Sequence, residues 1–489
     1  MLPISAFADA VEVNGIYYNL NNETKEAEVT YGNWDLNVGG HEGRYNGDIV
    51  IPESIEYQGA IYKITSIGED AFGGCMSLNS VVIPNSVLSI NARAFSFCSA
   101  LSNITIPNSV TSVGENAFIR CTELTRVSIG NGVETIGTRS FENCTAIISL
   151  DLGKNIKTID ENAFAYCSGI KSVVIPNSVT EIGLKAFSGC NNMTSLKIGS
   201  NTSFIGDRAF SSCSSLLSII VDNANVTFDS RDNCNAIIDT KTNTLISGCK
   251  ATIIPNGVTS IGKYAFTGIT TINSIKIPEG VVSIDIGAFL YCSGLISVDL
   301  PHTLTSIGNS AFSECTKLSS ISLPQSVSSI GAYAFELCES ITSLTIPNGI
   351  TTIKNGTFRV CSSLASVLIT NSVTNIERQA FQYCNNIKNI YCYAKGVPGT
   401  SDDIFEGSYI ENATLHVPEE SISDYSARIP WIYFKRIVAL TASDPQPTGI
   451  RNMKELLDNN IIIYDLNGVR LSEPRKGVNI ISGKKYWVK

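Results

Sequence analysis

The sequence predicts a solenoid, a β-rich α+β fold of stacked 23-residue coils with β-structure capping both ends. Two observations predict it: a phenylalanine recurs at a regular 23-residue step, and a cysteine nearly always follows it three places later. A third is that 43% of the chain is hydrophobic, enough for a large core. Periods of about 20 to 50 residues are typical of stacked-coil proteins. One step is longer than the others, from the seventh to the eighth of the phenylalanines Phe72, Phe95, Phe118, Phe141, Phe164, Phe187, Phe210, Phe266, Phe289, Phe312, Phe335, Phe358 and Phe381.

Each coil is expected to hold short strands and one helical turn. Val173 and Ile175 alternate with outward positions, the period of a strand, and Pro176 ends the run because proline cannot donate to a strand ladder. A second extended segment, SVTEIG, follows, and LKAFSGC then predicts a helical turn that places Phe187 and Cys190 inward. A single coil cannot bury its own apolar face, so the coils must stack. Roughly fourteen coils at a spacing of ~4.8 Å give a rod about 65 Å long.

The recurring cysteine, Cys167 in one coil, is predicted to pack in the core. A thiol nucleophile needs a base, and the chain has only 3 histidines. Zinc needs several convergent ligands, whereas each coil offers one thiol. Neighbouring coils bring equivalent cysteines within disulfide range, yet Ile269 replaces cysteine in one coil, as expected for a small buried hydrophobe. We therefore expect no catalytic, cofactor-binding or metal-binding residue.

The long step contains NCNAIIDTKTNTLISGCK, which predicts a β-hairpin spliced into one modified coil at residues 222–254. Closing the hairpin over the loop TKTN sets Ile237 opposite Ile246 and Cys234 opposite Cys249. Two alternatives stay open for the facing cysteines: a disulfide, or two buried thiols.

The pattern divides the chain into six segments. Near the start, Ala6-Phe7-Ala8 before Asp9 has the small-x-small form of a signal-peptidase site and indicates the end of an export signal. The segments are 1–60, an export-signal remnant and N-terminal β cap; 61–221, repeat block one; 222–254, the modified coil; 255–392, repeat block two; 393–440, a C-terminal cap; and 441–489, a linker and small β module.

Two rows of outward residues are expected along the first strand of each coil. Serine dominates the row five places after the cysteine, which favours a soluble, close-packed surface. The row seven places after the cysteine varies from coil to coil, as a recognition face of stacked coils would. We take this second row, called the variable row below, as the candidate binding face; its candidate residues are Thr105, Ser128, Asp151, Lys197, Lys276, Asp299, Ser322, Thr345 and Tyr391.

The repeat IGxxAFxxCxxLxxIxIPxSVTxI resembles the BspA-like, or TpLRR-type, leucine-rich repeats of bacterial cell-surface proteins, over about residues 61–392. The resemblance implies a leucine-rich-repeat solenoid in an exported protein, located outside the cell or on the outer cell surface. It also implies partners such as a host matrix protein, a host cell-surface protein or another bacterial surface component. The tail from residue 441 resembles the short C-terminal sorting or secretion modules of Bacteroidetes-type surface proteins.

Composition argues against a nucleic-acid-binding protein and against a membrane-spanning protein. A net charge of −9 and a pI near 5.1 argue against a nucleic-acid partner. Nowhere do 18 apolar residues run together, so no transmembrane segment is expected. We therefore expect a non-enzymatic, monomeric adhesion protein without a cofactor. The alternatives are a glycan-binding module that uses Tyr391 or Trp431, a hydrolase built on the caps or the tail, and an extracellular scaffold without a ligand.

Overall fold

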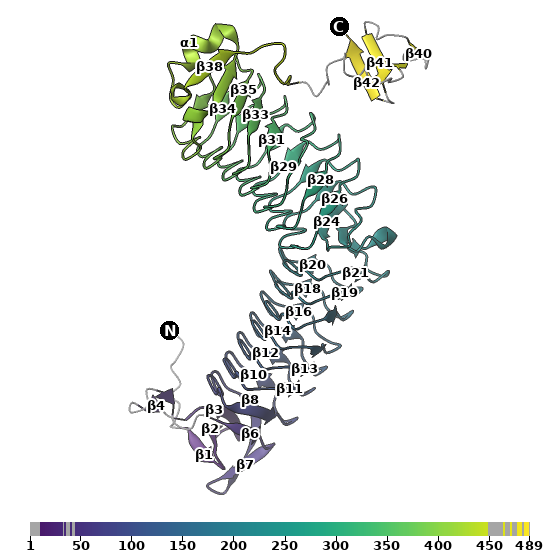
Figure 1. The fold of residues 1–489 in the computed structure, drawn as a ribbon. Helices are drawn as coiled ribbons and strands as arrows, with labels where there is room; N and C mark the ends of the chain where they lie inside the picture. The colour runs from purple at the N-terminus through teal and green to yellow at the C-terminus, as the bar shows by residue number, and fades with distance from the viewer. Residues whose placement is uncertain are drawn as a thin grey trace.

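The chain folds into a β-solenoid of about 16 turns that changes direction near β20 and β24 (Figure 1). The computed structural model describes residues 10–447 except 33, 36–39 and 42–44, together with the backbone of four strands between residues 463 and 488. The signal-peptidase pattern at residues 6–9 lies outside the described residues. The number of turns exceeds the fourteen expected because both ends of the chain add strands to the ladders.

The first strands of the coils pair in parallel with the strands one coil away, in register at the 23-residue step. They lie along one side of the rod (Figure 1). These strands are β9 (Leu78–Val82), β11 (Asn103–Ile106), β13 (Arg126–Ile129), β15 (Ser149–Asp151), β17 (Ser172–Val174), β19 (Ser195–Ile198), β21 (Ser218–Val221), β26 (Ser274–Lys276), β28 (Ser297–Asp299), β31 (Ser343–Thr345), β33 (Ser366–Ile369) and β35 (Asn389–Cys392).

The second extended segments form another parallel ladder along a different side of the rod (Figure 1). Its members are mostly two residues long. They are β8 (Ala60–Ile67), β10 (Ser89–Ile90), β12 (Ser112–Val113), β14 (Thr135–Ile136), β16 (Thr158–Ile159), β18 (Glu181–Ile182), β20 (Phe204–Ile205), β25 (Ser260–Ile261), β27 (Ser283–Ile284), β29 (Ser306–Ile307), β30 (Ser329–Ile330), β32 (Thr352–Ile353), β34 (Asn375–Ile376) and β36 (Gly399–Thr400).

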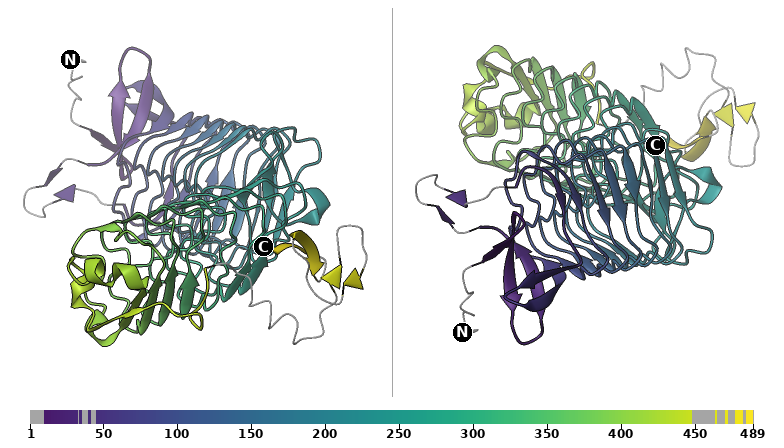
Figure 2. Two further views of the ribbon diagram at one scale, coloured as in Figure 1. Left: turned by 90° about the horizontal axis from the view of Figure 1, so that it is seen from above. Right: turned by 90° about the horizontal axis from the view of Figure 1, so that it is seen from below.

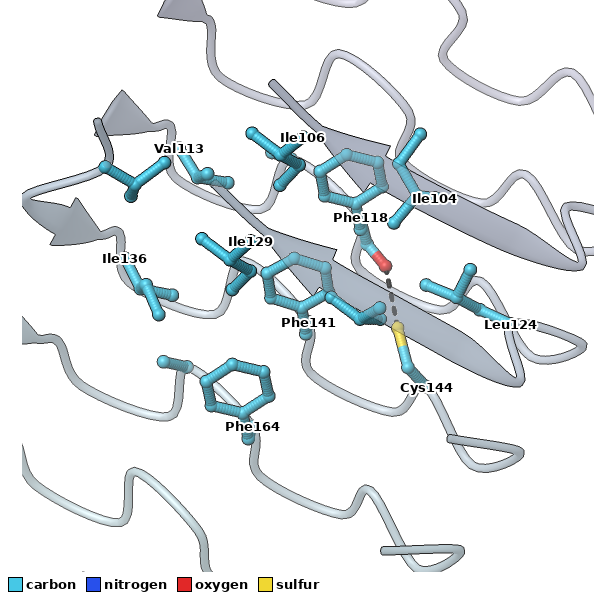
Figure 3. Packing of buried hydrophobic residues seen from close by; sticks show 14 of the residues in the cluster. Ile104, Ile106, Val113, Phe118, Leu124, Ile129, Ile136, Phe141, Cys144 and Phe164 are labelled. Atoms are coloured by element: carbon cyan, nitrogen blue, oxygen red, sulfur yellow. Dashed lines mark hydrogen bonds between the residues drawn. The ribbon is translucent and has the colours of Figure 1, made fainter. Parts of the chain in front are cut away.

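The recurring phenylalanines stack through the middle of the rod. In block one, ring centroids from Phe72 to Phe210 lie 4.8 to 5.8 Å apart with interplanar angles of 3° to 13°. Figure 3 shows Phe118, Phe141 and Phe164 in this stack, with Ile and Val side chains of the two ladders around them. The rings are fully buried, so each coil contributes its largest apolar side chain to a continuous column.

The cysteines pack beside the phenylalanines and also donate hydrogen bonds. The Cys144 Sγ–H donates to the carbonyl of Phe118 in the preceding coil over 3.0 Å (Figure 3). The same bond, at 3.0 to 3.4 Å, recurs at Cys98, Cys121, Cys167, Cys190, Cys213, Cys292, Cys315, Cys338, Cys361 and Cys384. Core packing is therefore confirmed, and the thiol has the added role of a weak donor to a buried carbonyl.

The expected helical turn around each Ala-Phe pair is wrong. The segment is a run of turns in which alternate backbone N–H groups donate hydrogen bonds to carbonyls of the next coil. Phe95 N donates to Ala117 O and Phe97 N to Ile119 O, at 2.7 and 2.8 Å. Two residues per coil take left-handed backbone, such as Arg139 with φ 54°. Among the described residues, helix is limited to α1 (Ile422–Tyr425) and the 3-10 turns η1 (Arg231–Asn233), η2 (Ile410–Asn412), η3 (Glu419–Ser421) and η4 (Trp431–Tyr433).

The N-terminal residues start both ladders. Strand β3 pairs in parallel with β8 and β6 with β9, while β1, β2 and β7 add antiparallel pairs. The ring of Tyr45 lies 4.5 Å from that of Phe72 and closes this end of the stack. The strands are β1 (Val11–Val13), β2 (Ile16–Asn21), β3 (Glu26–Thr30), β4 (Trp34–Asp35), β5 (Gly40–His41), β6 (Gly47–Val50) and β7 (Ser54–Tyr57).

The long step between the two blocks holds β22 (Phe228–Asp229) and the predicted hairpin, β23 (Ile237–Asp239) with β24 (Thr244–Ser247). Strand β24 pairs in parallel with β25 and so joins the second ladder, while the turn η1 projects from the side of the rod (teal in Figures 1 and 2). A bulge sets Ile237 opposite Ser247, so the expected pairing with Ile246 is wrong by one residue. The hydrophobic core divides into two clusters at this hairpin.

The two hairpin cysteines fall on either side of that division. Cys234 belongs to the cluster of block two and Cys249 to that of block one, and both are buried free thiols. Cys249 Sγ–H donates to Asn235 O over 3.4 Å. A disulfide between the two cysteines stays a prediction for the oxidised protein.

The ladders continue past residue 392. Strand β35 pairs with β37 (Thr414–Val417), which pairs with β38 (Arg436–Ala439). Phe405 extends the ring stack at 5.7 Å from Phe381, and Trp431 and Phe434 meet Phe405 edge-on at 5.7 and 5.6 Å. Further along the chain, an antiparallel sheet has the order β40 (Arg470–Leu471), β39 (Ile463–Tyr464), β41 (Gly477–Ile481), β42 (Lys484–Val488).

We predict that Phe141→Ala lowers the free energy of unfolding by about 3 to 5 kcal/mol, because it opens a cavity in the middle of the ring stack. Urea unfolding followed by far-UV circular dichroism measures the effect. The exposed change Glu123→Gln is the control and should stay within about 0.5 kcal/mol of the unchanged chain. A loss below about 1 kcal/mol in Phe141→Ala would contradict the packed column.

Candidate binding face

The structure brings the residues of the variable row together as neighbours in the first-strand ladder. Thr105 pairs with Ser128, which pairs with Asp151, and Lys276 pairs with Asp299. The row crosses four separate sheets, interrupted after β15, at the modified coil and after β28. Most of its side chains are exposed; Ser128 and Tyr391 are half-buried.

Within the described residues, most polar side chains of the row have no hydrogen-bond or ion-pair partner. Lys197 forms an ion pair with Asp222, with Nζ and Oδ2 3.7 Å apart. Within the described part of the chain, no side-chain hydrogen bond or ion pair involves the polar members Thr105, Ser128, Asp151, Lys276, Asp299, Ser322 and Thr345. These donors and acceptors are available to a ligand.

Apolar side chains of the same row are also exposed. Val82, Val174 and Ile220 are 55%, 63% and 52% exposed. Sequence reasoning missed Ile253, which is 76% exposed and takes this position in the modified coil. The signal was present, because TIIPNGV matches the strand and proline of the regular repeat. Leu368 interrupts the row, since it is only 4% exposed.

Tyr391 lies in an intramolecular cluster at the C-terminal end of the row. Its ring centroid is 4.4 Å from that of His416, whose Nδ1 is 3.6 Å from Asp444 Oδ1. Tyr393 Oη–H donates to Pro445 O over 2.8 Å, so the chain after β38 returns over this face. Burial lowers the pKa of His416, although Asp444 raises it in part. The contact with His416 therefore reduces the ring surface of Tyr391 on which a sugar could stack.

Other outward rows serve the fold. Thirteen places after the cysteine, threonines such as Thr111 and Thr180 donate from Oγ1 to a carbonyl of the preceding coil. Aromatic residues just before the cysteine cover glycines of the next coil: a Cβ on Gly189 would lie 2.6 Å from the ring of Tyr166. These rows carry fixed contacts from coil to coil, which separates them from the variable row.

The thiols lack the setting of reactive groups. All the cysteines are buried, and burial raises the pKa of Cys213, Cys292 and Cys384 to about 12. A protonated, buried thiol is a poor nucleophile and metal ligand. Over the described ranges, no group of three or more His, Cys, Asp or Glu side chains is placed to hold a metal ion. In that same part of the chain, no helix has the length and apolar character to cross a bilayer.

Comparison with known proteins gives a family and a fold. The family model of the BspA type leucine rich repeat region matches residues 53–171, 157–247, 246–365 and 305–428, well over half of the chain. No curated protein matches the chain. The residues matched extend past the 61–392 expected from the repeat alone.

Three solved structures resemble the chain. A leucine-rich repeat protein from Bacteroides ovatus has 27% identity and a TM-score of 0.59, covering 84% of this chain and 100% of its own. The pneumococcal vaccine antigen PcpA has 18% identity and a TM-score of 0.57, covering 88% of this chain and 98% of its own. A leucine rich cell surface protein from Faecalibacterium prausnitzii has 22% identity and a TM-score of 0.46, covering 89% and 96%.

We predict that stability falls as the pH rises from 9.0 towards about 12. The unfolded chain ionises its thiols near pH 9.0, whereas the pKa of Cys213 is about 12 in the folded chain, so the folded state holds more protons in this window. Below pH 9.0 both states are protonated and this contribution is fully present.

The measurement is the free energy of unfolding in urea across this pH range. In Cys213→Ala the number of protons linked to unfolding near pH 10.5 should fall by about one, while Glu123→Gln should leave it unchanged. An equal slope in Cys213→Ala and the unchanged chain would mean that the thiol ionises in the folded protein.

Proposed function

Because the chain belongs to the BspA-type leucine-rich repeat family, we propose that it is a non-enzymatic protein of the cell surface that binds a protein ligand through the variable row. Proteins of this family are typically found on the cell surface, and leucine-rich repeat proteins generally bind proteins. The ligand class is a host matrix or cell-surface protein, or another bacterial surface component. The role is adhesion by an exported, monomeric rod.

One observation carries the proposal: exposed polar side chains without partners within the described residues stand in register along the row. Elsewhere on the coils, threonine and aromatic rows are occupied by contacts to neighbouring coils. The variable row instead offers Lys276 beside Asp299 in one place and Val174 beside Lys197 in another. This mixture of charged, polar and apolar groups is suited to a protein surface, whose own groups are equally mixed.

The mechanism is distributed contact on a rigid support. The strands that carry the row are held by parallel pairing to strands of neighbouring coils, as β19 is on both sides, so little conformational entropy is lost when a ligand orders them. Several weak contacts along one rod then add through a high effective concentration. No pocket is required for this mode of binding.

The aromatic side chains expected for the glycan alternative are not available on this face. Trp431 is completely buried beneath Tyr425 and Phe434, with ring centroids 5.3 and 6.3 Å away. Tyr391 is half-buried, and its ring packs at a tilt against that of His416. Binding to a protein ligand is therefore the better-supported proposal.

We predict that the intact chain binds at least one protein in a panel of laminin, fibronectin and collagen, measured by biolayer interferometry. Exchanging the neighbouring charges with Lys276→Asp and Asp299→Lys should weaken that binding about tenfold, because each charge then faces a like charge of the ligand.

The matched control exchanges Glu134→Lys and Lys157→Glu, which are neighbours on the second ladder and are exposed. This control keeps the same net charge and should change the affinity by less than about twofold. Absence of binding to the whole panel would count against a matrix ligand, and equal affinities in the two variants would exclude the variable row as the binding face.

A further inference from the structure

A pocket of about 470 Å³ opens at the C-terminal end of the rod, beside the last ring of the phenylalanine stack. Its lining comes from residues 402–403 and 405–411 and from Pro430 and Tyr433. Ile410 and Glu411 of this lining belong to the turn η2, and Tyr433 belongs to the turn η4. This volume is within the range of pockets that hold small ligands or single side chains of a partner.

The lining is acidic. Four of its lining residues are acidic, Asp402, Asp403, Glu406 and Glu411, and no Lys, Arg or His is among them. Two of these carboxylates have partners outside the lining: Asp403 pairs with Arg378 over 3.1 Å, and Glu406 accepts from a Gln382 amide. Asp402 and Glu411 are exposed, and neither side chain has a hydrogen bond or ion pair within the residues that the structure describes.

Aromatic rings stand beside these carboxylates. Tyr409 and Tyr433 are 58% and 54% exposed, and Phe405 is buried. Tyr409 has left-handed backbone with φ 47°, at a place that is not one of the two left-handed positions of the regular repeat. Aromatic faces attract cations, so the tyrosines and the carboxylates favour the same kind of ligand.

We propose that this pocket binds a lysine or arginine side chain of a protein partner. The observation that decides between a cation and a neutral sugar is the charge: Asp402 and Glu411 have no ion-pair partner within the described residues, and unpaired carboxylates are offset by a cation and not by a sugar. The pocket is a second site, at the end of the rod rather than along the variable row. It shares with the proposed function the premise that the ligand is a protein.

The test uses the full chain and a fluorescein-labelled peptide of alternating lysine and alanine, with binding measured by fluorescence anisotropy. In Asp402→Asn with Glu411→Gln, the affinity should fall about threefold to tenfold, because two unpaired carboxylates lose their charge. The matched control is Glu123→Gln with Glu134→Gln, which removes the same charge from exposed positions on distant coils and should change the affinity by less than about twofold.

An aromatic variant separates the pocket from general attraction to an acidic chain. Tyr433→Leu should weaken binding about twofold to fivefold at constant charge, whereas Tyr291→Leu, another exposed tyrosine, should have no effect. The same peptide with Nε-acetylated lysines should not bind.

Two outcomes would overturn the proposal: equal loss in the pocket variant and its control, or binding of neutral oligosaccharides that is lost in Tyr433→Leu while peptide binding is kept. Failure here is distinguishable from failure of the proposed function. The exchange of Lys276 and Asp299 tests the variable row, and it should leave peptide binding at the pocket unchanged.

Discussion

The whole structure depends on one constraint, that successive coils must stay in register. The 23-residue step brings each phenylalanine ring over the last one and each thiol to the carbonyl of the phenylalanine before it. Towards the C-terminal end the stacked rings become less parallel, and the largest angle occurs where the step changes. Ring planes differ by 3° to 5° in the middle of block two, by 14° between Phe358 and Phe381, and by 21° at Phe405, which lies one position beyond the regular step. Register therefore matters more than the identity of any one residue, and Ser408 shows this by donating to Phe381 O over 2.6 Å in the place of a thiol.

The sequence was enough to predict the architecture because the period repeats one packing problem many times. The two strands, the buried cysteine and the inserted hairpin were each predicted from spacing or alternation. The turn around the phenylalanine was not, because its left-handed positions are held by glycine in some coils, such as Gly189, and by residues such as Arg139 and Asn143 in others. Hydrogen bonds from that turn to the next coil stabilise a backbone conformation that local propensity disfavours, and no signal in one coil reveals them.

The candidate face was predicted only in part, for a similar physical reason. Its row follows from strand alternation, which predicts that residues such as Thr105, Ser128 and Asp151 are neighbours on the first strands of successive coils, as they are. What covers a row depends on contacts between segments distant in the chain. Tyr393 reaches Pro445, 52 residues on, and this return of the chain over the end of the ladder has no periodic signature. The one-residue bulge at Ile237 also has no signature in the sequence. Ile237 can be buried whether its partner across the hairpin is Ile246, as expected, or Ser247, as observed.

Some rows of side chains stabilise the stack of coils, whereas the variable row is exposed to a ligand. This difference explains how a rod of nearly identical coils can be specific for one ligand. Phenylalanine, cysteine, threonine and glycine positions are committed to coil-to-coil contacts, and a change at any of them disturbs two neighbours. The variable row contributes almost nothing to those contacts, so its side chains can differ in each coil at little cost in stability. Side chains at the ends of the rod are also less restricted by the repeat, because the last coil must match a neighbouring coil on one side only. The acidic pocket lies there, beside Phe405, where the chain departs from the regular repeat.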